Sequence, residues 1–541
     1  MLCRLQTPRV LGVFFAHLPY SGNLRCEVAN MRIGFDYLYF MCNHSFCQGE
    51  NEHEREKITF TKQIAAFMTV LTLTKAFFSY IIHLAAERGG IMLVSFRIGN
   101  FRSFDKEENF SMEAGRTRNY MERTVRSASV RILKFKSVYG ANSSGKSNLV
   151  RAIDLMQDAV LHGIPANAST DYCRMDQDNV DRPSHFEIEV MFDNVLYIYG
   201  FEALLNAGSF TKEWLIEKKG QKNKTVFMRD VRMGTYDVTS YINNSTINER
   251  LTIYADDIKN DGTILFLRSM NQNKDALYNE KSPIQIYKTL FHWFRFKLSV
   301  NYPDEPITQY NYFFDSQGSA KAEELLERLD TGISKVQVCD ESTEKVMSQF
   351  PKKLYQDILD NLNEQKRKNE ERGINVDPAI MLRTNEGHSM YILELQGEEI
   401  NCKTLKFRHK HSSSLFSLWE ESDGTIRLLD LLEVLLSNSK DMVYIIDEVS
   451  RCLHPLLTKR FIGDFLSMAE KRNIQLIVTT HEADLLDLDL IRQDEVGFVG
   501  RRAEDGTSKI FGLGDFGARF DKRIRKAYLD GDYGAVPNIA K

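Results

Sequence analysis

The chain has 541 residues, of which 43% are hydrophobic and 27% charged, and its formal net charge at pH 7 is −4. This is the composition of a globular protein with room for two or three domains. The net charge excludes a global basic signal for nucleic acid, so that only a local basic face could serve that purpose. The eight cysteines are scattered without the spacing of a disulfide framework, which is typical of the reducing cytoplasm.

Residues 1–91 form an extension without a clear fold signal. Its longest apolar run, residues 64–86, is long enough to cross a bilayer, but Lys75 makes such a position costly, and no membrane partner is expected. Residues 87–90 read Glu-Arg-Gly-Gly, which a purine-rich ribosome-binding sequence can encode, and Met92 follows almost at once. We therefore hypothesise that the natural protein begins at Met92.

The same extension contains two cysteines and two histidines that could be drawn as a zinc site. Their spacing matches no standard zinc finger, so unligated thiols are the preferred interpretation. The four residues are Cys42, His44, Cys47 and His53.

A strand, a glycine-rich loop and a helix follow. Residues 132–139 are a predicted apolar strand, residues 147–160 a predicted helix, and the loop between them reads G-x-x-x-x-G-K-S. Such a loop points several N–H groups at phosphate oxygens, and the helix N-terminus adds partial positive charge. Lys146 can reach the β- and γ-phosphates, and the Ser147 hydroxyl can bind Mg²⁺. This context favours a P-loop for ATP and Mg²⁺ over a chance glycine-rich turn; its residues are Gly140, Ala141, Asn142, Ser143, Ser144, Gly145, Lys146 and Ser147.

The middle of the chain mixes strand and helix signals. Residues 185–229 alternate between apolar and polar positions, which predicts antiparallel strands. Residues 276–297 and 320–372 look helical, and the charged run that ends the second of these is either a solvated helix face or a surface for a partner or DNA. The absence of sustained heptads argues against a long coiled coil.

Polar residues mark the start of one late helix. The basic cluster at residues 406–411 is either a surface loop or a face for DNA or phosphate. Residues 420–425 then lead into a predicted helix over 426–436. Ser422 and Gly424 at its start offer a hydroxyl and free N–H groups, which could bind phosphate or simply cap the helix.

Two late apolar strands end in chemically useful residues. Residues 441–447 end in Asp447, a candidate magnesium partner. The next residue, Glu448, is a candidate general base for the attacking water. Residues 474–480 lead to His481, which can contact the γ-phosphate. The alternatives are a core strand with charged residues at its exit and an ordinary surface histidine.

Together these residues resemble the ABC-type ATPases of the RecF, SMC and OLD-like group, and more specifically the bacterial AAA family ATPases related to OLD, RloA and Septu. The resemblance implies an α/β fold, namely a P-loop ATPase head with a mixed sheet plus antiparallel strands, and a mainly helical insertion. We expect the head in residues 92–230 and 401–541 and a lid-like insertion in 231–400, because Ser147 and Asp447 lie 300 positions apart (447 − 147), roughly twice the separation that a compact head needs. The motifs that carry the resemblance lie at residues 96–104, 140–147, 421–425, 447–455, 479–487 and 526–537.

The family implies a homodimer in which two heads sandwich two ATP molecules. Ser422 and Gly424 of one copy then complete the nucleotide site of the other, and the segment with Arg102 and Ser103 runs beside the nucleotide. Residues 450–453 are expected to cross the dimer interface. The sequence departs from the transporter signature LSGGQ, and it does not identify a glutamine-loop residue. The residues expected to act on ATP within one head are Lys146, Ser147, Asp447, Glu448 and His481.

The resemblance implies an ATPase that converts ATP and water to ADP and phosphate. OLD proteins carry a Toprim nuclease after the head, but only 60 residues follow His481 (541 − 481), too few for that domain. We therefore expect the sensor of an anti-phage defence system with a separate nuclease or toxin as effector, with DNA as a further candidate partner. The alternatives are a RecF-like repair or recombination ATPase, a transporter subunit and a nucleotide-gated scaffold; the missing LSGGQ argues against the transporter.

Overall fold

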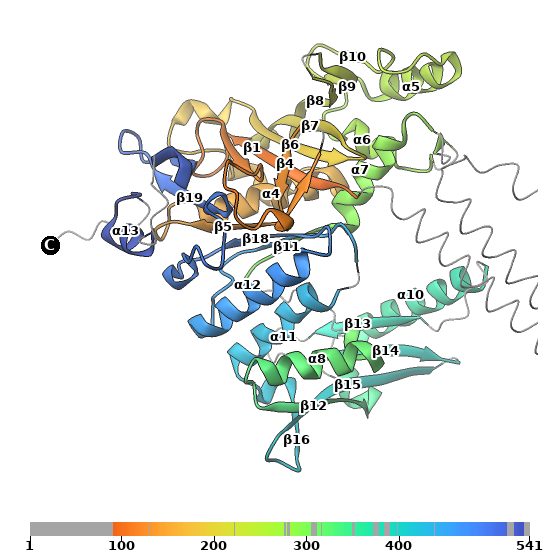
Figure 1. Ribbon diagram of the computed structural model, residues 1–541. Coiled ribbons are helices and arrows are strands. Elements are labelled where there is room, and N and C mark those ends of the chain that lie inside the picture. Colours follow the sequence, from red (N-terminus) through yellow and green to blue (C-terminus); the bar gives the residue numbers. More distant parts are fainter. Residues whose placement is uncertain are drawn as a thin grey trace, which may run out of the picture. The chain divides into compact units, whose positions relative to one another are not determined.

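The computed structural model describes residues 90–534 apart from 128, 221, 275–276, 279–281, 304–310, 315, 349–351, 372–377, 384–389, 398, 438 and 517–523 (Figure 1). The chain divides into two compact units, Met1–Glu87 and Arg88–Lys541, and the second is described below. The residues of the possible zinc site and of the possible membrane span lie outside the described part of the chain. The hypothesis that the natural protein begins at Met92 also concerns residues outside that part. Within the described ranges, no helix has both the length and the apolar character needed to span a bilayer.

A six-stranded sheet forms the centre of the unit. Its first five strands are parallel and the sixth is antiparallel, so the carboxyl ends of the five meet at one edge. In spatial order the strands are β11 (Leu298–Asn301), β17 (Val443–Ile446), β18 (Gln475–Thr479), β5 (Phe135–Tyr139), β19 (Val496–Arg501) and β20 (Ser508–Gly512).

Both faces of this sheet are buried, which explains why its strands are continuous apolar runs. Val443 and Ile445 of β17 belong to the core that includes α4 (Lys146–His162), whereas Tyr444 and Ile446 point into the core formed with α11 (Asp423–Leu436) and α12 (Pro455–Ala469). The predicted helices over 147–160 and 426–436 are therefore confirmed.

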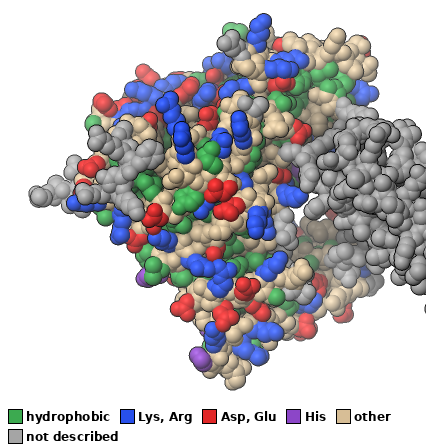
Figure 2. Space-filling view, in the orientation of Figure 1, with side chains coloured by type: hydrophobic (Ala, Val, Ile, Leu, Met, Phe, Trp, Pro, Cys, Tyr) green, Lys and Arg blue, Asp and Glu red, His purple; other side chains and the backbone are tan. Residues whose placement is uncertain are grey.

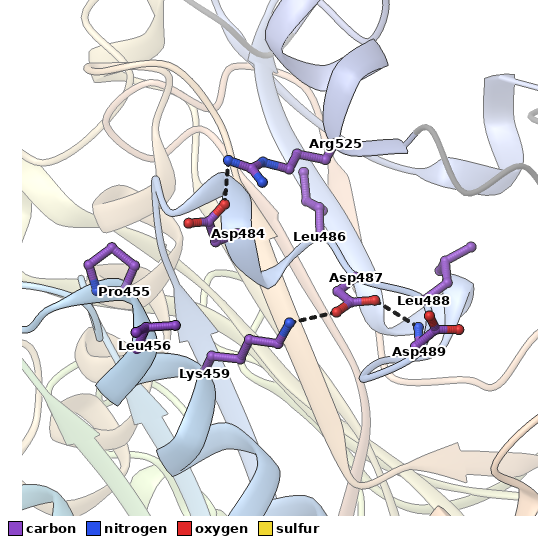
Figure 3. Close-up of a pocket in the computed structure, with 9 residues that line it drawn as sticks. All are labelled: Pro455, Leu456, Lys459, Asp484, Leu486, Asp487, Leu488, Asp489 and Arg525. Atoms are coloured by element: carbon purple, nitrogen blue, oxygen red, sulfur yellow. Dashed lines mark hydrogen bonds and ion pairs between the residues drawn. The ribbon is translucent and has the colours of Figure 1, made fainter. Parts of the chain in front are cut away.

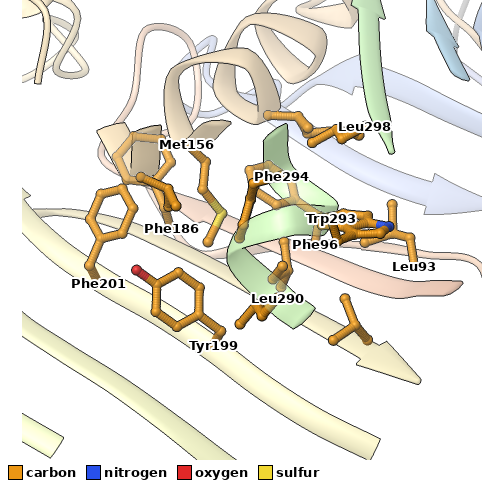
Figure 4. Close-up of a cluster of buried hydrophobic side chains, with 14 of the residues drawn as sticks. Leu93, Phe96, Met156, Phe186, Tyr199, Phe201, Leu290, Trp293, Phe294 and Leu298 are labelled. Atoms are coloured by element: carbon orange, nitrogen blue, oxygen red, sulfur yellow. The ribbon is translucent and has the colours of Figure 1, made fainter. Parts of the chain in front are cut away.

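A seven-stranded antiparallel sheet packs against α4 and α7 (Gln285–Phe296), as Figure 4 shows for Phe96, Phe186 and Tyr199 of the sheet with Met156 and Phe294 of the helices. Each such side chain contributes roughly 1.5–3 kcal/mol when fully buried. The prediction of antiparallel strands in residues 185–229 is confirmed. The order is β10 (Thr235–Asp237), β9 (Lys224–Asp230), β8 (Ser209–Lys218), β7 (Val195–Leu204), β6 (Ser184–Phe192), β1 (Met92–Gly99) and β2 (Glu108–Ser111).

A third sheet corrects one helix prediction. Residues 320–372 are not helical throughout, because β12 (Ile333–Glu341) lies between the helices and pairs with β15 (Glu399–His409). The alternation of Val336 and Val338 with polar residues is a strand pattern that the flanking helical signals obscured. The other members are β14 (Met390–Gln396), β13 (Ala379–Arg383) and β16 (Leu415–Ser417), with helices α8 (Ser316–Arg328), α9 (Thr343–Met347) and α10 (Lys352–Glu371).

Two further boundaries differ from the sequence prediction. The predicted strand over 132–139 is two strands, because the chain changes sheets at Lys134, whose ammonium donates a hydrogen bond to the Ala469 carbonyl at 2.5 Å. The helix predicted over 276–297 begins only at Gln285. The remaining elements are β3 (Thr124–Arg126), β4 (Arg131–Leu133), α5 (Ser245–Ile258), α6 (Phe266–Ser269) and α13 (Ile524–Asp530).

The α/β fold is thus confirmed, with a mixed sheet beside antiparallel strands. The region between residues 231 and 400 contains both helices and strands.

Candidate nucleotide site

The glycine-rich loop between β5 and α4 has the backbone conformation that its glycines allow. Gly145 has φ = +113°, and Ser143 is also left-handed at φ = +60°. A Cβ atom on Gly145 would lie 2.3 Å from Ser508 Oγ, and one on Gly140 would lie 2.3 Å from the Val499 carbonyl oxygen. Close packing around the loop therefore requires both glycines, and the left-handed backbone requires glycine at position 145 in addition.

The Lys146 side chain folds back over this loop. Its ammonium donates hydrogen bonds to the carbonyl oxygens of Gly140 at 2.9 Å and Ala141 at 3.2 Å. Burial lowers the pKa of Lys146 to about 8, against the opposing effect of the Asp447 and Glu448 carboxylates. Lys146 is 5% exposed, and among the described residues its ammonium has two neutral carbonyls and one imidazole within hydrogen-bonding distance. Such a cation is well suited to an incoming anion.

Asp447 is held by three different elements at the end of β17. Its Oδ1 accepts a hydrogen bond from Thr479 Oγ1 at 2.5 Å, and its N–H donates to the Asn301 carbonyl at 2.9 Å. Arg427 of α11 reaches its carbonyl oxygen at 3.4 Å. The residue is 3% exposed. A carboxylate held in place in this way suits Mg²⁺, which prefers oxygen ligands.

Glu448 follows in a strained turn. Its φ is +48°, which is rare for a residue with a Cβ, and its N–H donates to Thr479 Oγ1 at 2.9 Å. Two residues later, Ser450 Oγ lies 3.1 Å from Thr480 Oγ1. Strain of this kind persists only where neighbours hold the chain, and it is often found at functional sites.

His481 lies next to Lys146. Its Nδ1 is 3.5 Å from the Lys146 ammonium nitrogen. Partial burial lowers the pKa of His481, and the Lys146 charge adds to this effect. The ring is exposed to solvent, so a ligand above the loop could reach it. Lys146, Asp447, Glu448 and His481 are thus brought to one edge of the sheet.

The two residues expected beside the nucleotide, Arg102 and Ser103, make different contacts. Ser103 Oγ is 2.8 Å from Ser508 Oγ and accepts a hydrogen bond from Asn148 Nδ2 at 2.8 Å, which places it against the P-loop. Arg102 instead pairs with Asp171 at 3.0 Å. It lines a hollow of about 560 Å³ whose other lining residues include Tyr302, Asp447, Glu448 and Arg451.

Ser422 and Gly424 are not joined to this loop by the contacts that position them. Ser422 caps α11 by accepting a hydrogen bond from the Thr425 N–H at 3.1 Å. A Cβ on Gly424 would lie 2.8 Å from the Cys452 carbonyl oxygen, so this glycine lets residues 450–453 pass closely. The two residues therefore lie beside the segment expected at a dimer interface.

Sequence reasoning missed several residues that shape the site. Thr479 could have been noticed as a polar residue at the end of an apolar strand. Ser508 and Arg501 gave no local signal, yet Ser508 Oγ lies 2.6 Å from the Ser144 carbonyl oxygen and Arg501 donates to the Ser143 carbonyl at 2.8 Å. Asn301, at the end of β11 beside Asp447, also went unnoticed.

A second hollow, of about 380 Å³, lies between the start of α12, residues 484–489 and α13, and none of Lys146, Asp447, Glu448 and His481 lines it (Figure 3). Lys459 points at Asp487 at 2.6 Å and Arg525 at Asp484 at 2.5 Å. Because both cations are engaged by carboxylates, this hollow does not offer an anion site.

Comparison with known proteins adds the family. Residues 137–489 match the family model described as "AAA domain, putative AbiEii toxin, Type IV TA system". No curated protein matches the chain.

Similar solved structures include an SMC head bound to the C-terminal winged-helix domain of ScpA (16% identity, TM-score 0.34, 78% of this chain and 98% of that one). An SMC head domain from Thermotoga maritima has 11% identity, a TM-score of 0.31 and the same coverage. A Pyrococcus furiosus SMC head with ScpA has 16% identity, a TM-score of 0.30, and 78% and 96% coverage. At these values the likeness says nothing about function. The family model, in contrast, spans more than half of the chain, and the chain therefore belongs to this AAA-domain family of ATPases.

Proposed function

We propose that the protein binds ATP with Mg²⁺ and hydrolyses it. The observation that carries this proposal is that three motifs meet at one edge of a parallel sheet. Lys146 Nζ lies 3.5 Å from His481 Nδ1, and the Asp447 and Glu448 carboxylates are close enough to raise the pKa of the Lys146 ammonium. A phosphate chain is the ligand that such a loop, a buried ammonium and adjacent carboxylates would hold together.

The residues fit the proposed ligands. Ser144 Oγ is buried without a hydrogen-bond partner among the described residues, and the Lys146 ammonium can exchange its carbonyl contacts for phosphate oxygens. Ser147 and Asp447 are the oxygen donors proposed to hold Mg²⁺, which would neutralise charge on the phosphates.

Each motif residue then has a separate task in hydrolysis. Glu448 would orient a water molecule and accept its proton as the water oxygen attacks the γ-phosphorus and ADP leaves. His481 would donate to, or orient, the γ-phosphate. Lys146 would stabilise charge on the transferred group.

We further propose that two copies sandwich ATP. Ser422 and Gly424, at the exposed start of α11, would complete the site of the other copy, and residues 450–453 beside them would lie in the interface. The assignment of 92–230 and 401–541 to the head belongs to the same proposal. The lid-like insertion predicted for 231–400 is smaller than that range, because β10, α7 and β11 belong to the two large sheets and their core.

The biological role that we propose is the sensor of a defence system, similar to RloA- or Septu-type systems, with a separate effector. The family description names an AbiEii toxin and a type IV TA system, and this link to toxin–antitoxin systems supports the proposal. The neighbouring genes test this role: a nuclease or toxin gene is expected, and replication or repair genes would favour the RecF-like alternative.

DNA is a less favoured partner. In the basic cluster at residues 406–411, His409 contacts Glu421 at 2.9 Å and Lys410 pairs with Glu327 at 2.6 Å, so part of its charge is neutralised. On the face shown in Figure 2, Lys and Arg side chains are interspersed with Asp and Glu among the described residues.

Nucleotide binding and phosphate release by the purified protein test the activity. Lys146→Ala removes a charge-assisted phosphate contact and is expected to abolish ATP binding. A Lys146→Ala protein that binds ATP with the parent affinity would refute the P-loop assignment.

A further inference from the structure

The end of β18 lies between the P-loop strand and the strand that carries the two carboxylates. β18 pairs with β5 on one side and with β17 on the other. Its last residue, Thr479, is 1% exposed. A hydroxyl buried at this position can reach the turn that follows β17.

The Thr479 hydroxyl acts both as a hydrogen-bond donor and as a hydrogen-bond acceptor. The single hydroxyl proton is donated to Asp447 Oδ1 at 2.5 Å, and a lone pair accepts the Glu448 N–H at 2.9 Å. The Thr479 carbonyl also accepts the Val449 N–H at 3.1 Å. One residue therefore fixes the side chain of the proposed metal ligand and the backbone of the proposed base.

The second threonine extends the same attachment. Thr480 is fully buried, its N–H donates to the Val138 carbonyl at 3.0 Å, and its Oγ1 lies 3.1 Å from Ser450 Oγ. The turn over residues 447–450 is thus tied to β18 at both ends, which explains how Glu448 is kept at φ = +48°.

We propose that Thr479 is a positioning residue for ATP hydrolysis, which orients Asp447 toward Mg²⁺ and sets the backbone from which Glu448 acts. This inference rests on the proposed function. Holding Oδ1 leaves Oδ2 of Asp447 for the cation or its water, and second-layer hydrogen bonds of this kind tune metal affinity. Thr479 touches neither nucleotide nor water in this scheme.

The test compares Thr479→Val, which keeps the volume and removes the hydroxyl, with Thr479→Ser, which keeps the hydroxyl. Loss of such a partner typically costs about 10- to 100-fold in metal affinity or activity. We expect Thr479→Val to bind ATP without Mg²⁺ as the parent does, to need about 10-fold more Mg²⁺ for half-maximal turnover, and to have a kcat lowered by about 10- to 100-fold. Thr479→Ser should restore both values to near the parent.

Thr211→Val is the matched control. Thr211 lies in β8 of the antiparallel sheet, is 3% exposed, and its hydroxyl has no hydrogen-bond partner among the described residues. This variant makes the same chemical change in a buried strand and should leave kcat and the Mg²⁺ requirement unchanged.

The outcomes separate this inference from the proposed function. A parent protein that binds no ATP overturns both. A parent that hydrolyses ATP while Thr479→Val matches it in kcat and Mg²⁺ requirement overturns the positioning role alone, as does a Thr479→Ser variant that is no better than Thr479→Val. If valine prevents folding, Thr479→Cys replaces it, because a thiol is a weaker donor and acceptor; parent-like kinetics in that variant overturn the inference as well.

Discussion

Substituting Gly145 by alanine tests the packing of the P-loop directly. At φ = +113° an alanine is strained by about 1–3 kcal/mol. Its Cβ would lie 2.3 Å from Ser508 Oγ and 2.8 Å from Ser103 Oγ, so that the neighbours must move at a further cost of about 1–3 kcal/mol. We expect a loss of about 2–6 kcal/mol in the free energy of unfolding and a marked loss of ATP affinity.

Gly208→Ala is the control for backbone strain. Gly208 has φ = +60°, and no heavy atom lies within 4 Å of the Cβ it would acquire, so only about 1–2 kcal/mol is expected. Urea unfolding of both variants measures the difference, and equilibrium titration with ATP measures binding. Adding Ser508→Ala to Gly145→Ala removes the nearest atom and should recover part of the stability. The reasoning is refuted if Gly145→Ala costs no more than Gly208→Ala and binds ATP like the parent.

Three other predictions concern the chemistry of the site. Burial lowers the pKa of Lys146 to about 8 in the free protein, and a bound phosphate favours the charged form of its ammonium. ATP binding should therefore take up protons, and the ATP affinity should weaken by up to about tenfold per pH unit between about pH 8 and 10. Calorimetry in buffers of different ionisation enthalpy measures the proton uptake, and the absence of uptake near pH 8.5 contradicts the prediction. Glu448→Gln should retain ATP binding, stop phosphate release and trap a dimer on size exclusion; turnover at the parent rate would show that another group is the base. Ser422→Arg should bind ATP as a monomer but not turn it over, and an unchanged rate would contradict the shared site.

The spacing of apolar residues along the chain predicted those strands and helices whose buried faces impose a regular pattern. The apolar runs before Asp447 and His481, the helix after the P-loop and the alternation over residues 185–229 each follow a periodicity that burial imposes. The same reasoning failed at Lys134 and β12. A lysine inside an apolar run gave no sign that the chain changes sheets there, since its ammonium is satisfied by Ala469, which lies 335 positions away.

The residues that hold the P-loop from distant parts of the sequence could not be predicted for a related reason. Ser508 and Ser144 are 364 positions apart, and the serine has no motif around it that indicates a contact with the P-loop. Arg501 likewise reaches Ser143 only because β19 pairs with β5. Such contacts depend on strand order, which local patterns of apolar and polar residues do not reveal.

Strand order also explains why a long middle region can separate the two halves of the site. β18 lies between β5 and β17, so the P-loop and the carboxylates are one strand apart in space whatever the length of chain that joins them. β18 therefore links the two halves: its backbone pairs with both β5 and β17, and Thr479 Oγ1 at its end is bonded to Asp447 and Glu448. Changes within residues 231–400 that leave β11 in place should consequently not displace the carboxylates from the P-loop.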